Sequence, residues 1–83
     1  MLEITLYTKG NCSLCLKAKR VLQDVQRRCP FHLREVDITT SEELYEHYKN
    51  DIPVAMANGE ELFRHRVEAG ALEQALIERN NTI

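Results

Sequence analysis

The hydrophobic pattern of this chain changes its period at a short loop, and this change is the strongest constraint on its fold. Apolar residues alternate with polar ones from Leu2 to Thr8, as in a half-buried strand. After Lys9-Gly10-Asn11 they recur instead at the spacing of one helical face, up to Cys29-Pro30, where proline cannot continue a helix. The pattern therefore predicts a strand, a tight loop and a helix over Leu14–Arg28. The apolar face of this helix consists of Leu14, Ala18, Val21, Leu22 and Val25.

A second strand and a second, shorter helix follow. Phe31–Ile38 reads as a strand, with Val36 and Ile38 as its best candidates for burial. Thr40-Ser41-Glu42-Glu43 places a hydroxyl and a carboxylate three residues apart, which is the capping-box pattern that begins a helix. We expect this helix to turn three side chains inward: Leu44, Tyr45 and Tyr48.

A hairpin and a last helix complete the predicted order. A turn at Asn50-Asp51-Ile52-Pro53 leads into two short strands, Val54–Ala57 and Glu61–Arg64. Asn58-Gly59 joins them and tolerates the positive φ angles of a tight hairpin. The order β-α-β-α-β-β-α predicts a single α/β domain over residues 1–83. The last helix runs out near Asn80-Asn81, with an apolar face of Ala69, Leu72, Ala75 and Leu76.

Composition and charge narrow the class of protein. The 83 residues carry 11 Lys and Arg against 13 Asp and Glu, whereas a domain that binds nucleic acid is usually clearly basic. The longest apolar run, Val54–Ala57, is far shorter than the ~20 residues that cross a bilayer. No targeting signal is expected before the first strand. We therefore expect a cytoplasmic protein with no nucleic-acid or membrane partner.

Two of the three cysteines, Cys12 and Cys15, lie where the predicted loop becomes the first helix. Unpaired backbone N–H groups and the positive end of the helix dipole meet there and stabilise a thiolate on Cys12. Lys9, just upstream, adds a favourable positive charge. Cys15 lies one turn further, near enough to attack a mixed disulfide formed at Cys12 and release the reduced substrate. The pattern predicts a redox-active dithiol, with a pair of ordinary half-buried thiols as the alternative.

The cysteines also match a metal-binding pattern. Cys12-x2-Cys15-x13-Cys29-x2-His32 has the spacing of a four-ligand zinc site. A continuous helix argues against this site, because a rise of about 1.5 Å per residue puts Cys15 and Cys29 about 20 Å apart. Two sulfurs on one zinc each lie about 2.3 Å from the metal. We therefore expect no metal site and interpret Cys29 as a half-buried structural thiol.

With this order of elements and this cysteine position, the sequence resembles the glutaredoxin branch of the thioredoxin superfamily over almost its whole length. The run Lys9-Gly10-Asn11-Cys12-Ser13-Leu14-Cys15 resembles the family's lysine-x-x-Cys-x-x-Cys segment, and Ile52-Pro53-Val54 resembles its cis-proline segment. The resemblance implies sheet order 2-1-3-4, with the first and third helices on one face and the second on the other. It also implies Cys12 as nucleophile, Cys15 as resolving cysteine, and Lys9, Ile52 and a cis Pro53 beside the substrate.

The function implied by this resemblance is a monomeric thiol–disulfide oxidoreductase that reduces protein disulfides or mixed disulfides without a bound cofactor. Its electron donor would be glutathione or thioredoxin reductase. Ser13-Leu14 replaces the Pro-Tyr of the usual glutaredoxin motif, and His65-Arg66-Val67-Glu68 stands where the family has a Gly-Gly pair that helps hold glutathione. The alternative function is a thioredoxin-fold module that uses the cysteine end to hold a partner or zinc without turnover.

The remaining residues with chemical potential have ordinary structural interpretations. The histidines are scattered over different elements, so we expect surface or core roles for them. Four basic residues, Lys9, Lys17, Lys19 and Arg20, belong to or precede the first helix and are expected to form a solvated face. Steering of an anionic substrate is the alternative role for these four.

Overall fold

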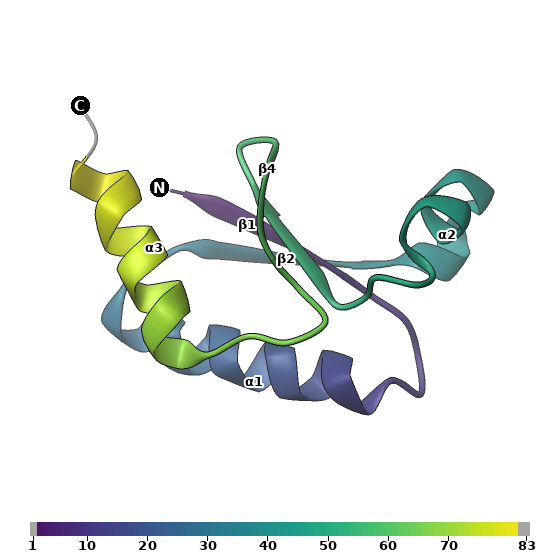
Figure 1. Ribbon diagram of the computed structural model, residues 1–83, viewed down its shortest axis with the longest axis horizontal. Helices are drawn as coiled ribbons and strands as arrows, with labels where there is room; N and C mark the ends of the chain where they lie inside the picture. The colour runs from purple at the N-terminus through teal and green to yellow at the C-terminus, as the bar shows by residue number, and fades with distance from the viewer. Residues whose placement is uncertain (1, 82–83) are drawn as a thin grey trace.

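The computed structural model describes residues 2–81, which form a four-stranded sheet and three α-helices in the predicted order (Figure 1). This confirms the predicted α/β fold. No helix within residues 2–81 is long and apolar enough to cross a lipid bilayer. The elements are β1 (Glu3–Thr8), α1 (Ser13–Arg28), β2 (His32–Asp37), a 3₁₀ turn (Ile38–Thr40), α2 (Glu42–Tyr48), β3 (Val54–Ala57), β4 (Glu60–Arg64) and α3 (Ala69–Asn81).

The sheet has the order β2-β1-β3-β4, as the resemblance implies. β1 pairs in parallel with β2 and antiparallel with β3, and β3 pairs antiparallel with β4. Asn58 and Gly59 connect the last two strands with φ angles of 53° and 80°, which confirms the predicted hairpin. Val54, at the start of β3, lies opposite Tyr7, near the end of β1. The turn before β3 and the loop after β1 therefore meet at the same end of the two central strands.

α1 and α3 pack together over one face of the sheet and enclose the core (Figure 1). Alternation along β1 buries Ile4 and Leu6, as the period-two pattern predicted. The helices face these residues with Leu22 and Val25 of α1 and with Leu72 and Leu76 of α3, while Ala69 packs against the cluster and the predicted Ala75 is half-buried outside it. The other buried members of this cluster are Ala18, Phe31, Ala55 and Ala57.

The first turn of α1 departs from the predicted apolar face. Cys15 is buried there, with 4% of its surface exposed, whereas Leu14 and Val21 are only half-buried. Cys15, Ala18, Leu22 and Val25 follow the spacing of a single helical stripe, and the two half-buried residues flank that stripe. The side chain that meets the sheet at the start of the helix is therefore a cysteine.

Leu22 lies at the centre of the core with no exposed surface. We expect Leu22→Ala to lower the free energy of unfolding by about 2–5 kcal/mol, because it removes buried methyl groups and leaves a cavity. Urea unfolding followed by circular dichroism measures this change. The exposed Gln23→Ala serves as control and should stay within about 0.5 kcal/mol of the wild type. Equal stability of the two variants would contradict the packing of α1 on the sheet.

α2 lies on the opposite face of the sheet, as the resemblance implies. Since Leu6 faces α1, its neighbour Tyr7 points the other way, where its ring stacks on Tyr48 of α2 at 4.4 Å between centroids. Desolvation by burial, followed by the proximity of Tyr7, raises the pKa of Tyr48. The predicted burial of Tyr45 is wrong, since 37% of its surface is exposed. A helix of seven residues presents only a narrow face to the sheet, and Leu44 and Tyr48 occupy it half-buried.

α2 also begins later than the capping pattern predicted. Ser41 is its N-cap, and the Ser41 hydroxyl accepts the Leu44 N–H. Thr40 instead ends the 3₁₀ turn, where its hydroxyl donates to the Asp37 carbonyl at 2.7 Å. Thr40 and Ser41 both carry the oxygen that an N-cap needs, and the turn that precedes them decides which one caps the helix.

The two residues that flank β2 are more buried than the strand itself. Ile38, just after the strand, is fully buried as predicted, whereas Val36 is half-buried. Phe31 enters the core directly before the strand, with 3% of its surface exposed, and the sequence pattern did not single it out. β2 lies at the edge of the sheet, so its central side chains have few neighbours to bury them.

Candidate active site

The loop after β1 delivers Cys12 to the start of α1. Lys9 and Gly10 are exposed to solvent, and Asn11 turns the chain with a φ angle of 59°. Asn adopts this left-handed geometry more readily than most residues, because its short side chain can bond locally. Cys12 returns to extended geometry, with φ −114° and ψ 106°, and is the N-cap of α1. The predicted place of Cys12, at the point where the loop becomes a helix, is confirmed.

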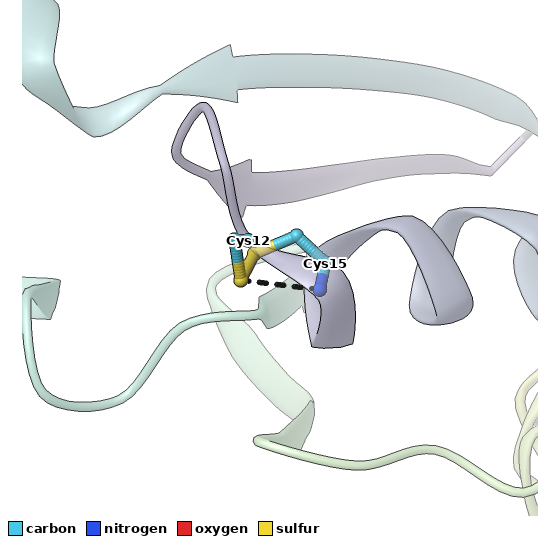
Figure 2. Close-up of a disulfide and its surroundings, with 2 residues drawn as sticks. All are labelled: Cys12 and Cys15. Atoms are coloured by element: carbon cyan, nitrogen blue, oxygen red, sulfur yellow. Dashed lines mark hydrogen bonds between the residues drawn. A yellow bond between two sulfur atoms is a disulfide. The ribbon is translucent and has the colours of Figure 1, made fainter.

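The sulfur of Cys12 takes the place of the usual capping oxygen. The backbone N–H of Cys15 donates to Cys12 Sγ at 3.2 Å (Figure 2). The first turn of α1 contains no acidic side chain that would oppose a negative charge there. A thiolate on Cys12 would therefore face a backbone donor and the positive end of the helix dipole. This geometry favours the thiolate form of Cys12 once the disulfide is reduced.

Cys12 and Cys15 form a disulfide across the first turn of α1, with 5.2 Å between their Cα atoms (Figure 2). The two sulfurs differ in access. Cys12 is partly exposed, whereas Cys15 is 4% exposed and lies against the core side of the helix. An external sulfur can therefore meet Cys12, while Cys15 is positioned to react with Cys12. This asymmetry suits a first attack by one cysteine and a second, internal attack by the other.

The Ile52–Pro53 peptide bond is cis, and Pro53 is buried. It lies at the end of the central strands where the loop after β1 begins. Two backbone hydrogen bonds fix this segment. The Ile52 N–H donates to the Tyr48 carbonyl at 3.2 Å, and the His65 N–H donates to the Pro53 carbonyl at 2.9 Å. The resemblance implied that the backbone of Ile52 is available to a substrate. Its N–H is already bonded within the protein, which leaves the Ile52 carbonyl for that role.

A cluster of two ionised side chains and a histidine, which the sequence pattern did not indicate, holds the same segment. The Asp51 carboxylate lies 3.4 Å from Arg64 Nη1 and 3.9 Å from His65 Nε2. His65 has a left-handed φ angle of 66°, and its N–H also approaches the Asp51 carbonyl at 3.3 Å. Asp51 comes just before the cis bond in the sequence. Arg64 is the last residue of β4, and His65 follows that strand. Only the pairing of β3 with β4 brings them together, so no local signal in the sequence could reveal the contact.

A hollow of about 670 Å³ opens beside the disulfide on the side of β2. The ammonium of Lys19 lies 3.3 Å from the carboxylate of Glu35 in its wall. The hydroxyl and the backbone N–H of Thr39 hold the pKa of Asp37 below its ordinary value. Charges of both signs are thus balanced around this hollow. Besides both cysteines, its charged lining consists of Lys9, Lys19, Glu35 and Asp37.

The zinc alternative does not fit this fold. α1 is continuous over Ser13–Arg28, so Cys15 and Cys29 lie at its opposite ends, about 20 Å apart for a rise of about 1.5 Å per residue. Among the residues that the structure describes, no three His, Cys, Asp or Glu side chains come together as metal ligands would. Cys29 is the C-cap of α1, half-buried against the core, and its N–H donates to the Val25 carbonyl at 2.8 Å.

This fold and this disulfide define a thioredoxin-fold protein with a Cys-x-x-Cys pair at the start of its first helix. The family model of the Glutaredoxin-like domain (DUF836) matches residues 3–77, and the chain belongs to this family. The curated "Glutaredoxin-like protein YDR286C homolog" of Dictyostelium discoideum is 31% identical over an alignment of 77 positions, and the match covers 86% of this chain and 71% of that protein.

Solved structures show the same fold. Protein XcR50 from X. campestris has a TM-score of 0.79 at 26% identity, covering 90% of this chain and 96% of its own. Protein Ne2328 from Nitrosomonas europaea has a TM-score of 0.77 at 22% identity, covering 89% of each chain. A mutant thioredoxin from Halobacterium salinarum has a TM-score of 0.70 at 15% identity, covering 99% of this chain and 77% of its own.

Proposed function

We propose that this protein is a thiol–disulfide oxidoreductase that reduces protein disulfides or mixed disulfides through a Cys12/Cys15 dithiol. The observation that carries the proposal is the contact of Cys12 Sγ with the Cys15 N–H at 3.2 Å, at the N-cap of α1. The disulfide between the same residues and membership of the glutaredoxin-like family support the same class of reaction.

The reaction proceeds in two exchanges at sulfur. The Cys12 thiolate attacks one sulfur of the substrate disulfide, the substrate S–S bond breaks, and the other substrate sulfur leaves as a thiolate that takes a proton from solvent. Cys15 then loses its proton and attacks Cys12 Sγ, which releases the second substrate thiol. The substrate gains two electrons and two protons, and Cys12–Cys15 becomes the disulfide. An external donor returns two electrons to that disulfide.

The burial of Cys15 gives the second exchange its direction. With 4% of its surface exposed, Cys15 is poorly placed to meet a second substrate molecule. Its Cα lies 5.2 Å from that of Cys12, so the internal attack needs no diffusion. A mixed disulfide at Cys12 is therefore resolved from within the chain.

Three residues outside the cysteine pair are proposed to contact the substrate. The exposed ammonium of Lys9 lies in the wall of the hollow beside the disulfide. There it attracts an anionic group and favours the Cys12 thiolate. The carbonyl of Ile52 accepts an N–H from an extended substrate segment. Pro53, whose ring is buried beside the β1 loop, shapes the end of the sheet against which that segment lies.

The electron donor is glutathione or thioredoxin reductase, and one contact favours the reductase. The segment His65-Arg66-Val67-Glu68 stands where related proteins have the Gly-Gly pair that helps hold glutathione. The N–H of His65 already donates to the Pro53 carbonyl at 2.9 Å, so it is not free for a glutathione carboxylate. A donor that brings its own dithiol does not require that anchor.

Turnover with each donor tests the proposal. The protein is supplied with insulin as disulfide substrate and with NADPH, through glutathione and its reductase in one arm and thioredoxin reductase in the other. We expect protein-dependent NADPH consumption, faster in the second arm. If no disulfide is reduced in either arm or with dithiothreitol, although the Cys12–Cys15 bond itself is reduced and re-formed, the protein is a binding module rather than an enzyme.

A further inference from the structure

A second, smaller hollow of about 210 Å³ lies between α1 and the segment that follows β4. This segment runs along α1 on its way to α3 (Figure 1). Leu14, which stands between the two cysteines in the sequence, forms part of the wall, so the hollow begins within the first turn of α1. Its full lining is Leu14, Lys17, Ala18, Val21, His65, Arg66 and Val67.

The lining of this second hollow contains two ionised side chains, Lys17 and Arg66, and both are positive. Lys17 and Arg66 are exposed, and their side chains have no hydrogen bond or ion pair with any side chain that the structure describes. His65 approaches Asp51 at 3.9 Å, but that carboxylate also pairs with Arg64 at 3.4 Å. No Asp or Glu is among the lining residues. We call this site the basic hollow.

The two hollows near the start of α1 therefore differ in the charge of their linings. Around the larger one, Lys19 is paired with Glu35, and Asp37 offsets Lys9. No carboxylate lines the basic hollow, and the rest of its lining includes the apolar side chains of α1 and Val67. A short aliphatic stem that ends in a carboxylate fits both properties, because the stem covers apolar surface while the carboxylate meets cations.

We propose that the basic hollow selects disulfide substrates whose cysteine is flanked by acidic residues, with Lys17 and Arg66 binding their carboxylates. The inference rests on the function proposed above, since the acidic residues must be presented beside a sulfur that Cys12 attacks. Lys17 lies five residues after Cys12, about 7.5 Å along α1 for a rise of about 1.5 Å per residue. Extended chain advances about 3.3 Å per residue, so a side chain about two positions from the substrate cysteine spans that distance. The occupant is an acidic segment of a protein disulfide.

The first exchange is the step to measure, with peptides that carry a thionitrobenzoate group on their cysteine. The Cys12 thiolate attacks the peptide sulfur, the Cys12–peptide disulfide forms, and thionitrobenzoate leaves as a coloured thiolate. Three capped peptides, Glu-Glu-Cys-Glu-Glu, Gln-Gln-Cys-Gln-Gln and Lys-Lys-Cys-Lys-Lys, present the same sulfur with different charge. For the reduced wild type at low salt, we expect the acidic peptide to react roughly tenfold faster than the neutral one, and the basic peptide slowest.

Matched substitutions locate the effect. Lys17→Gln and Arg66→Gln should each slow the acidic peptide about threefold and leave the neutral peptide unchanged. Arg20→Gln removes the same charge from an exposed site on α1 that does not line the hollow, and it should slow neither peptide. The inference is overturned if the neutral and acidic peptides react alike, or if Arg20→Gln has the same effect as Lys17→Gln.

Two further arms separate this inference from the proposed function. If Cys12→Ser releases thionitrobenzoate from every peptide as fast as the wild type, the proposed function fails. If release depends on Cys12 but not on peptide charge, only the inference fails. A glutathione–thionitrobenzoate disulfide carries the same carboxylate chemistry on a different backbone. If Lys17→Gln and Arg66→Gln slow this compound but not the acidic peptide, the hollow binds glutathione and the assignment to a protein segment is wrong.

Discussion

Cys12→Ser is expected to reduce the turnover of a disulfide substrate by a factor on the order of 10³ or more. Serine keeps the size of the side chain and can still accept the Cys15 N–H, so the helix start should remain intact. A hydroxyl at this place cannot form a mixed disulfide, and Cys15 is too buried to replace Cys12 as the attacking sulfur. Insulin reduction with dithiothreitol or NADPH as the source of electrons measures the loss.

Cys29→Ser is the control for this variant. Cys29 lies at the other end of α1, where its N–H caps the helix and its side chain packs half-buried on the core. Serine keeps the backbone contact, so turnover should stay within about twofold of the wild type. If turnover survives in Cys12→Ser and disappears in Cys29→Ser, the reaction depends on Cys29, and the proposed role of Cys12 is wrong.

Cys15→Ser should stop the reaction after the first exchange. Cys12 retains its place at the N-cap and still attacks the substrate, because the contact with residue 15 is made by the backbone N–H and does not depend on the thiol. The mixed disulfide then has no internal thiol to resolve it and accumulates toward one adduct per chain. Intact-mass spectrometry under non-reducing conditions, after incubation with a peptide disulfide, measures the adduct.

The site of that adduct is as informative as its amount. Proteolysis and peptide mapping should place it on Cys12, and the double variant with Cys12→Ser should form none there. The wild type should show little adduct under the same conditions, since Cys15 releases it. An adduct that forms mainly on Cys29, or a Cys15→Ser variant that turns over as fast as the wild type, would contradict the two-cysteine mechanism.

The elements that the sequence predicted well are those fixed by local patterns. The apolar spacing and Cys29-Pro30 bounded α1, and Asn58-Gly59 determined the hairpin through its positive φ angles. The position of Cys12 at the helix start followed from the same boundary. The sheet order and the placement of helices on its two faces came from the resemblance, since periodicity alone does not determine which strands pair.

The errors arose where the local sequence favours two nearby residues equally for the same structural role. Thr40 and Ser41 both suit an N-cap, and the 3₁₀ turn selected Ser41. Tyr45 and Tyr48 lie on adjacent faces of α2. The position of Tyr7 on β1, where its ring stacks on Tyr48, decides which of the two is covered. In each case the deciding contact is made by a different element, so the helix's own sequence does not contain it.

The arrangement of charged side chains around the disulfide could not be predicted from the sequence, for the same reason. Lys17 and Arg66 line one hollow although they are separated by most of the chain, and Asp51 meets Arg64 only because β4 returns beside β3. Taken singly, each is an ordinary exposed charge. Their combination beside the cysteine pair is a property of the folded sheet.

The central claim is that the start of α1 stabilises a thiolate on Cys12, and the pH dependence of alkylation tests it most directly. The reduced protein is treated with iodoacetamide across a range of pH, and peptide mapping gives the rate at each cysteine. We predict that Cys12 reacts first, with its rate half-maximal at about pH 7 or below, compared with about 8.5 for an ordinary cysteine. A half-maximal rate for Cys12 at or above about pH 8.5, with Cys29 reacting as fast, would contradict the account.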